Sequence, residues 1–438
     1  MRAEPARLVE IDIDDLSHDG RGVGRVDGKV WFVDGALPGE RALVRPVRGK
    51  RSHALGVLDQ LLKPSPERVA PRCPVFGVCG GCVLQHLEHA AQLRFKSDLV
   101  VETFAKAGVS ELPAINLISR PPWGYRRRAR LGVRDVAKKG GILVGFRERN
   151  KSYVTPISSC DVLAPSVAQF LPGLTSLISE LSIRDRVPQV EVAVGDQDTA
   201  LVFRNLKAFS EADSNLLKTF AQSNGVQVFM QPQGPDSIVP VWPHEPRALF
   251  YELPDFSLKI CFSPTSFVQV NGAINEALVS TAIDWLALDP GDTLLDLFCG
   301  LGNFSLAGAR QAGGVVGIEG EMALVDQARS NAELNGIFNA RFIKHDLFLD
   351  NGPAWGVSGA TKVLVDPPRS GAIEALKVVC REVKPSRIVY VSCNPATLAR
   401  DAQFLVGTGA YRISQVSVVD MFPHTAHVET AALFEKVS

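Results

Sequence analysis

The chain has 438 residues, of which 46% are hydrophobic and 21% are charged, and its 47 Lys and Arg balance its 47 Asp and Glu. This composition predicts a soluble globular protein, and the length predicts two or three domains because it exceeds the usual size of one core. No run of about 18 apolar residues occurs, which argues against a membrane span, and Met1 to Leu16 lacks the apolar segment of a secretory signal. We therefore expect a cytoplasmic protein whose eight cysteines are reduced thiols, metal ligands or catalytic groups rather than disulfides.

The first 63 residues have the pattern of a small β-domain. Val9, Ile11 and Ile13 alternate with polar neighbours, and Asp27-Gly28 is typical of a hairpin turn. Short strands repeated over this length favour a small barrel, such as one that binds oligonucleotides. Prolines between residues 64 and 74 mark the end of this domain.

Four cysteines in the next part of the chain are spaced as metal ligands. Cys73, Cys79 and Cys82 form a C-x5-C-x2-C pattern, and Cys160 follows after 77 intervening residues. Four thiolates suit either an iron–sulfur cluster or zinc. A metal held by all four would fasten the cysteine segment to the chain around Cys160, and we expect its role to be structural.

The central part of the chain, residues 64–262, is expected to be a mixed α+β domain. It should contain a helix over residues 89–106, then short strands between residues 129 and 262 with one helix over residues 211–223. Basic residues gather in it, since eleven Lys and Arg lie between Arg120 and Lys151. A second basic cluster lies over residues 41–51. Such clusters either form ordinary solvated surface or bind the phosphates of a nucleic acid.

From residue 263 onward the pattern changes to alternating helices and strands. We expect a helix over residues 275–288 and strands at 293–298, 315–319, 340–344, 362–366 and 387–392. This alternation predicts a parallel sheet that is covered on both faces by helices.

A glycine-containing loop leaves the first of these strands. Gly300 and Gly302 follow the buried-strand sequence that contains Asp296, and Glu319 ends the next strand 23 residues after Asp296. That position lets Glu319 accept hydrogen bonds from ribose hydroxyls at the edge of the sheet. The loop is shorter than a dinucleotide-binding loop, so it suits S-adenosylmethionine, which has no pyrophosphate. The alternative is that Glu319 and the later acid Asp346 only cap helices.

A cysteine and two acids are placed at the ends of later strands. Asp366 ends the fourth strand before a Pro-Pro turn, and Cys393 ends the fifth strand before Asn394-Pro395. A cysteine beside a helix N-terminus can have a lowered pKa and act as a nucleophile, although most single cysteines are small core residues. A thiolate is needed to methylate C5 of uracil, because its addition at C6 makes C5 nucleophilic. Glu429 is then the candidate base for the C5 proton, or else an acid at the start of a surface strand.

These motifs resemble those of the RNA uracil-5-methyltransferase family. The resemblance is carried, in order along the chain, by residues 267–271 (FVQVN), 296–304 (DLFCGLGNF), 366–369 (DPPR), 392–395 (SCNP) and 427–429 (HVE). It implies a class I methyltransferase domain with a Rossmann-like α/β fold over residues 263–438. It also implies that Cys393 is the nucleophile and Glu429 the base. By the same resemblance, the pocket for S-adenosylmethionine or substrate is lined by Gln269, Phe298, Asn303, Glu319, Asp346 and Asp366.

The N-terminal features are similar to those of members of this family that act on bacterial 23S rRNA. Residues 17–25 (SHDGRGVGR) look like the opening of a TRAM domain, a small RNA-binding barrel, and the four cysteines look like ligands of a [4Fe–4S] cluster. The resemblance implies methylation of one 23S rRNA uridine, uridine 1939 in reference numbering, by a monomer without an obligate protein partner. Methylation of another 23S uridine or of tRNA, methylation of C5 of cytosine, and a non-catalytic RNA-binding role in ribosome assembly are the alternatives.

Overall fold

The computed structural model describes residues 7–349, 355, 357 and 359–437, and these divide into two compact units. Unit 1 comprises residues 1–99, 145–157 and 422–427, and unit 2 comprises residues 100–144, 158–421 and 428–438. Within the described residues, no helix has both the length and the hydropathy needed to cross a membrane.

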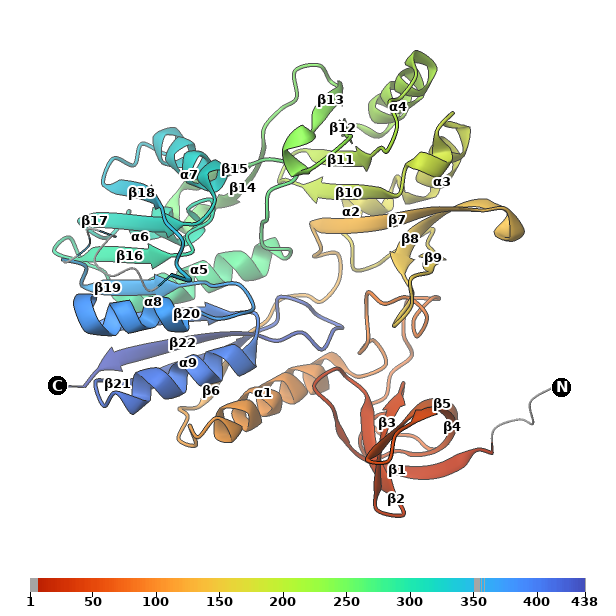
Figure 1. Ribbon diagram of the computed structural model, residues 1–438, viewed down its shortest axis with the longest axis horizontal. Helices are drawn as coiled ribbons and strands as arrows, with labels where there is room; N and C mark the ends of the chain where they lie inside the picture. The colour runs from red at the N-terminus through yellow and green to blue at the C-terminus, as the bar shows by residue number, and fades with distance from the viewer. Residues whose placement is uncertain (1–6, 350–354, 356, 358, 438) are drawn as a thin grey trace. The chain divides into compact units, whose positions relative to one another are not determined.

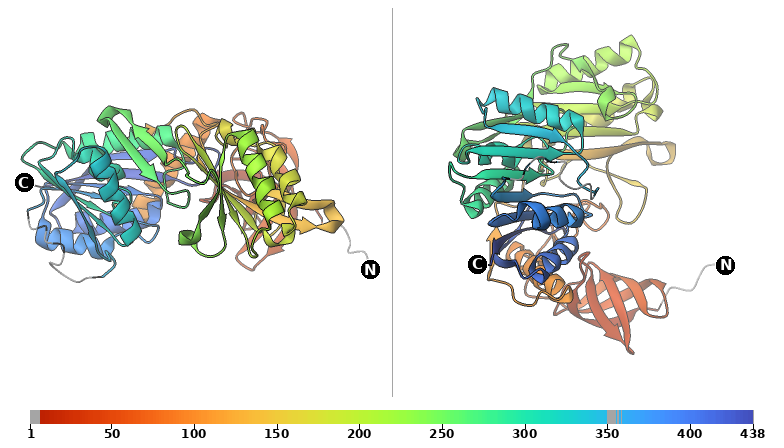
Figure 2. Two further views of the ribbon diagram at one scale, coloured as in Figure 1. Left: turned by 90° about the horizontal axis from the view of Figure 1, so that it is seen from above. Right: turned by 60° about the vertical axis from the view of Figure 1, so that its left-hand side comes forward.

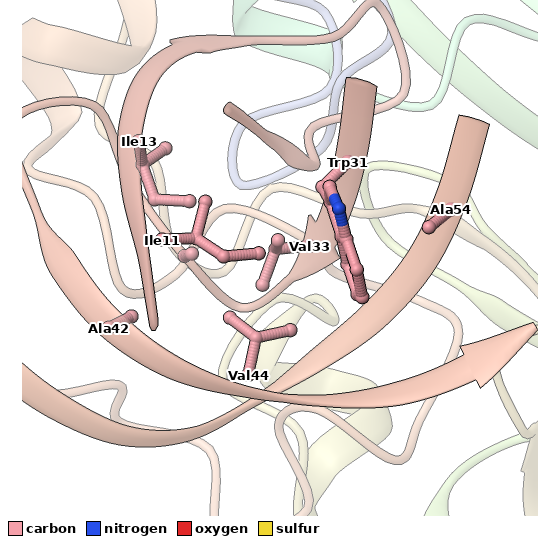
Figure 3. Packing of buried hydrophobic residues seen from close by; sticks show 8 residues of the cluster. Ile11, Ile13, Trp31, Val33, Ala42, Val44 and Ala54 are labelled. Carbon is pink, nitrogen blue, oxygen red and sulfur yellow. The ribbon is translucent and has the colours of Figure 1, made fainter. Parts of the chain in front are cut away.

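Unit 1 begins with a closed five-stranded barrel. Its strands are β1 (Val9–Leu16), β2 (Gly22–Val26), β3 (Lys29–Asp34), β4 (Arg41–Gly49) and β5 (His53–Lys63), arranged in the order β1-β2-β3-β5-β4. Every second residue of β1 points inward, so Ile11 and Ile13 pack against Trp31, Val33 and Val44 (Figure 3). The alternation in the sequence therefore predicted the barrel correctly.

A buried ion pair fastens the barrel to the segment that follows it. The carboxylate of Glu40 is 1% exposed and accepts hydrogen bonds from the Arg68 guanidinium and from the backbone N–H groups of Leu37 and Ser65. Burial alone would raise the pKa of Glu40, but these hydrogen bonds outweigh it and lower that pKa. The remainder of unit 1 includes the start of helix α1 (His89–Lys106) and strand β9 (Val154–Pro156), which pairs with the end of β8 (Gly141–Arg147).

Unit 2 contains a mixed sheet flanked by helices. Its strands are β7 (Arg128–Val136), the start of β8, β10 (Gln189–Val194), β11 (Thr199–Arg204), β12 (Gln227–Gln231) and β13 (Val239–Trp242), in the order β13-β12-β11-β10-β7-β8. Helix α4 (Glu211–Asn224) begins with a capping box between Ser210 and Asp213, which explains why its start was predictable. Helices α2 (Pro165–Ala168) and α3 (Leu171–Glu180) were not predicted. A separate hairpin of β14 (Leu249–Leu253) and β15 (Leu258–Phe262) follows.

The second sheet of unit 2 has eight strands in the order β18-β17-β16-β19-β20-β22-β21-β6. Its parallel part comprises β16 (Thr293–Leu297), β17 (Gly314–Glu319), β18 (Ala340–Lys344), β19 (Lys362–Val365) and β20 (Arg387–Ser392), which confirms the predicted strands. Strands β22 (Glu429–Lys436) and β21 (Tyr411–Val419) add antiparallel partners, and β6 (Ile115–Ile118) pairs with β21. The helices that flank both faces (Figures 1 and 2) are α5 (Gly272–Leu286), α6 (Asn303–Gly308), α7 (Met322–Leu334), α8 (Ile373–Val378) and α9 (Pro395–Gly407). This is the Rossmann-like methyltransferase fold.

Candidate active site

The loop between β16 and α6 turns sharply at the carboxyl edge of the eight-stranded sheet. Phe298, Gly300 and Gly302 all have positive φ angles, of 63°, 55° and 89°. Glycine adopts this conformation at no steric cost, but Phe298 is strained by it, as residues at ligand sites often are. Its ring lies 5.6 Å from the ring of Phe348, measured between centroids.

Glu319 connects this loop to the end of β17. Its carboxylate accepts hydrogen bonds from the backbone N–H of Gly300 at 3.1 Å, of Gly320 at 2.7 Å and of Glu321 at 3.1 Å. Three donors hold the side chain in one orientation at the sheet edge, where the sequence predicted it. In this state the carboxylate shapes the loop, and it remains half-buried rather than enclosed.

Asp296 lies beneath the loop and is fully buried. Its Oδ2 accepts a hydrogen bond from the hydroxyl of Ser305, whereas its Oδ1 has no partner in the described structure. Burial raises the pKa of Asp296 to about 7, and the nearby carboxylates of Asp366 and Glu319 add to this effect. An unpartnered buried oxygen at this position is suited to accept a hydrogen bond from a ligand.

Asn303, the first residue of α6, is fixed by two side chains from other elements. Asn303 and Asn275 of α5 exchange amide hydrogen bonds of 2.9 and 3.1 Å, and the Tyr251 hydroxyl donates to Asn303 Oδ1 at 2.9 Å. These contacts set the orientation of the Asn303 amide. Sequence reasoning predicted Asn303 but missed Asn275 and Tyr251, which only the fold brings to it.

Two other residues predicted to line the pocket lie on connecting segments. Gln269 lies between β15 and α5 and is partly buried. Asp346 follows β18, is exposed, and accepts a hydrogen bond from the Phe348 N–H at 3.0 Å. The Phe348 ring also contacts Phe298, so Asp346 belongs to a turn that packs on the glycine loop.

Asp366, Cys393 and Glu429 meet at the edge next to β19 and β20. Asp366 follows β19 and Cys393 follows β20, which is parallel to β19. Strand β22 is antiparallel to β20, with Thr430 opposite Ser392, so Glu429 at its start lies beside the end of β20. Glu429 is 3% exposed, whereas Asp366 and Cys393 are partly exposed.

The charges of these three groups influence one another. Burial raises the pKa of Glu429 to about 7. Burial and then the Glu429 carboxylate raise the pKa of Asp366 well above its usual range. Burial, Glu429 and Asp366 raise the pKa of the Cys393 thiol, and the Arg369 guanidinium partly offsets them. The pKa of Cys393 is therefore raised rather than lowered, because burial and then two carboxylates disfavour the thiolate.

The loop that precedes Glu429 in sequence belongs to unit 1 and is anchored there. Gln92 of α1 accepts a hydrogen bond from the His424 N–H at 2.9 Å and donates to the carbonyls of Leu84 and Leu87. The His424 carbonyl accepts from the N–H groups of Val83 and Leu84. His424 is 3% exposed, so these contacts fix the shape of the loop.

The cysteine segment of unit 1 pairs with the β8–β9 hairpin. The backbones of Cys79 and Glu148 form an isolated antiparallel β-bridge. The Gly80 N–H donates to the Arg147 carbonyl at 2.9 Å. The Gly81 N–H lies 3.4 Å from Cys79 Sγ, a contact of the kind that stabilises thiolate ligands. Among the described residues, none of the eight cysteines forms a disulfide. In that same part of the chain, no three His, Cys, Asp or Glu side chains are arranged to hold a metal ion.

Several residues of the basic clusters form ion pairs within the protein. Arg127 forms a 2.8 Å ion pair with Asp196, Arg130 pairs with Glu191 at 3.0 Å, and Arg149 pairs with Asp34 at 3.2 Å. Exposed basic residues of the two clusters include Arg48, Lys50 and Arg51 of the barrel, and Arg134, Lys138, Lys139, Arg147 and Lys151 near or on strands β7 and β8.

Comparison with known proteins identifies the family to which this fold belongs. Residues 242–346 and 358–437 match the tRNA (Uracil-5-)-methyltransferase family, and residues 2–58 match the TRAM domain. The 23S rRNA (uracil(1939)-C(5))-methyltransferase RlmD of Alkalilimnicola ehrlichii is 48% identical to this chain over 439 residues. The match covers 99% of this chain and 98% of that protein. The chain belongs to the RNA uracil-5-methyltransferase family. The resemblance drawn from its motifs is thereby confirmed.

Two further similarities support this assignment. The RlmD protein of Thiobacillus denitrificans is 48% identical over 431 residues, which cover 97% of this chain and 99% of that protein. The crystal structure of Pyrococcus abyssi tRNA (uracil-54, C5)-methyltransferase with S-adenosyl-L-homocysteine superposes with a TM-score of 0.76 at 26% identity. That match covers 97% of this chain and 100% of that structure. The family enzymes methylate C5 of uracil, and the archaeal enzyme holds the product of the methyl donor.

Proposed function

We propose that this protein transfers a methyl group from S-adenosylmethionine to C5 of a uridine in 23S rRNA, through a covalent bond between Cys393 and C6 of the base. One observation carries the proposal: Cys393 and Glu429 are at one sheet edge, because Thr430 of β22 lies opposite Ser392 of β20. A nucleophile and a base placed side by side are what methylation of an electron-poor C5 requires.

Cys393 would start the reaction as a thiolate. Its sulfur forms a bond to C6, and the electron pair of the C5–C6 double bond moves to the ring carbonyl oxygen as an enolate. S-adenosylmethionine would supply a methyl group on its sulfonium sulfur. C5 would form a bond to that methyl carbon as the bond between carbon and sulfur breaks and S-adenosylhomocysteine leaves. Cys393 is partly exposed, so the target uracil can reach it once this nucleobase is unstacked from the RNA.

Glu429 would complete the reaction as the general base. Its carboxylate removes the C5 proton, the C5–C6 double bond re-forms, and the sulfur of Cys393 leaves C6. Because burial raises the pKa of Glu429 to about 7, its carboxylate is a stronger base than an exposed glutamate at neutral pH. The pockets for the methyl donor and uracil would be lined by Gln269, Phe298, Asn303, Glu319, Asp346 and Asp366.

The RNA substrate follows from the relatives and from the exposed basic residues. Both RlmD proteins compared above are named for uracil 1939 of 23S rRNA and match nearly the whole chain. The barrel carries exposed Arg48, Lys50 and Arg51, which are suited to contact phosphates. A tRNA substrate is the second candidate, because the archaeal structure of the same fold belongs to a tRNA enzyme.

We also propose that Cys73, Cys79, Cys82 and Cys160 hold a [4Fe–4S] cluster. The chemistry of the donor set fits, since all four are reduced cysteines and the Gly81 N–H already points toward Cys79 Sγ. The cluster would act as a structural cross-link, with no part in methyl transfer. Anaerobically purified protein should contain about four iron and four sulfide per chain. Bound zinc in a colourless protein would contradict the cluster, and unchanged folding and RNA affinity in Cys82→Ser would contradict its structural role.

The function is tested with labelled S-adenosylmethionine and unmodified 23S rRNA or tRNA. Label at C5 of one 23S uridine is the expected result. Label on tRNA alone would keep the chemistry but overturn the rRNA substrate. Tight RNA binding without label would support a non-catalytic role in ribosome assembly, and label on cytosine would contradict the uracil chemistry.

A further inference from the structure

The turn that carries Asp366 is attached by side chains to the helix that follows Cys393. Asn394, the N-cap of α9, donates its amide to the Arg369 carbonyl at 3.0 Å. Arg400, six residues further along the chain in α9, donates from Nη2 to the Ser370 carbonyl at 3.0 Å. Asp401 accepts from the Ala372 N–H at 2.8 Å. Three backbone groups of residues 369–372 are therefore bonded to one helix.

Asp401 is the buried centre of this attachment. Its side chain is 0% exposed and accepts hydrogen bonds from the Tyr390 hydroxyl at 2.7 Å and from Arg400 Nε at 2.8 Å, besides the Ala372 N–H. Tyr390 lies on β20, three residues before Cys393. The carboxylate thus joins the strand that ends at Cys393, the helix that follows it and the turn that follows Asp366.

Gly371 shows how closely the turn and the helix approach. It has a φ of +79°, and a Cβ there would lie 2.5 Å from Arg400 Nη2 and 2.7 Å from Asp401 Oδ2. The other end of the turn is fixed to β16, because the Asp366 N–H donates to the Leu297 carbonyl at 3.2 Å. Asp366 is therefore held between the glycine-loop strand and α9.

We propose that Arg400 and Asp401 are positioning residues, which hold the Asp366–Ala372 turn in register with Cys393 for methyl transfer. This inference rests on the proposed function. Neither side chain is expected to touch the substrate. They act by keeping the Asp366 and Arg369 side chains at fixed positions relative to the thiol, and displacements of about 1 Å at reacting groups can lower a rate a hundredfold.

The sharpest test uses Arg400, because its side chain is 46% exposed, whereas that of Asp401 is fully buried. Arg400→Met removes both the bond to the Ser370 carbonyl and the charged partner of Asp401, so the thermal midpoint must be measured beside the rate. Arg400→Lys keeps a cation beside Asp401 but cannot serve both acceptors with a guanidinium fork. Arg412→Met is the matched control, since Arg412 is 70% exposed and pairs with Glu435 of the same sheet, away from the Asp366–Ala372 turn.

Single-turnover methylation of 23S rRNA, S-adenosylmethionine affinity and thermal midpoint are measured for each protein. We expect Arg400→Met to lower the rate at saturating substrates about tenfold or more. Its affinity for S-adenosylmethionine should stay within about twofold of wild type, because the glycine loop is untouched, and Arg400→Lys should be intermediate. An unchanged rate, or a rate lost only in step with affinity and thermal midpoint, would overturn the positioning role. If wild type and Arg412→Met are also inactive, it is the proposed function that fails.

Discussion

The carboxylate of Glu319 accepts a hydrogen bond from the backbone N–H of Gly300 at 3.1 Å, and this contact joins the ends of two neighbouring parallel strands. The same carboxylate accepts from Gly320 and Glu321. The glycine loop is therefore shaped by the acid that we propose binds the ribose of the methyl donor.

Glu319→Gln should weaken binding of S-adenosylmethionine. A glutamine amide keeps one acceptor oxygen but turns an NH2 group toward backbone donors, so at least one hydrogen bond to a charged acceptor is lost. A loss of this size corresponds to about a tenfold rise in Kd. Isothermal calorimetry measures it, with Glu321→Gln as the control because only the backbone N–H of Glu321 enters this network. An unchanged Kd for Glu319→Gln would show that binding of the methyl donor does not depend on the hydrogen bonds of this carboxylate.

The buried Glu429 should make stability depend on pH. Its pKa is raised from 4.5 to about 7 in the folded protein, so the unfolded chain loses this proton first as pH rises. The free energy of unfolding contributed by this group therefore falls between about pH 4.5 and pH 7, by about 3 kcal/mol. Glu429→Gln removes the ionisation and should be the more stable protein at pH 8. Urea unfolding at pH 5 and pH 8 measures the difference, and exposed Glu333→Gln is the control.

The same carboxylate should control the reactivity of Cys393. Since Glu429 raises the pKa of the thiol, Glu429→Gln should lower that pKa and increase the rate of alkylation near pH 8. Peptide mass spectrometry after a timed iodoacetamide reaction follows Cys393 separately from the other cysteines. Cys299, which is 5% exposed, serves as an internal control that should react slowly in both proteins. Equal alkylation of Cys393 in both proteins would contradict the electrostatic coupling.

The anchoring of the loop before Glu429 predicts a strong effect of Gln92. Gln92→Leu leaves the Leu84 and Leu87 carbonyls and the His424 N–H without this partner in a buried region. The expected cost is about 2–4 kcal/mol of unfolding free energy. Asp98→Asn, an exposed change on the same helix, should be neutral in urea unfolding. Equal stability of both variants would mean that water or neighbouring groups replace the glutamine.

What the sequence predicted well was local. The strand that contains Asp296, the acid at the end of the next strand and the cysteine before Asn394 follow from strand patterns and turn residues that are adjacent in sequence. The helix over residues 89–106 was predicted with the bounds that the structure shows.

What could not be predicted depends on distant contacts. No local sequence pattern predicts these pairings, because the partners are distant in sequence and only the folded chain brings them together. Examples are Asn275 with Asn303, Gln92 with His424 and Arg400 with Ser370. The basic residues show the same limit. Arg127 and Arg149 belong to a cluster that suggested a nucleic-acid surface, but acids from other elements pair with them.

The central claim is that Cys393 and Glu429 act on the same uracil, and Glu429→Gln tests it most directly. The variant is incubated with 23S rRNA and labelled S-adenosylmethionine, and the mixture is analysed on a denaturing gel and by mass spectrometry of the Cys393 peptide. Because the C5 proton would not be removed, we predict methylated RNA that is covalently bound to Cys393. The double variant Glu429→Gln, Cys393→Ala should form no such adduct. Release of free methylated RNA at the wild-type rate, without an adduct, would contradict the claim.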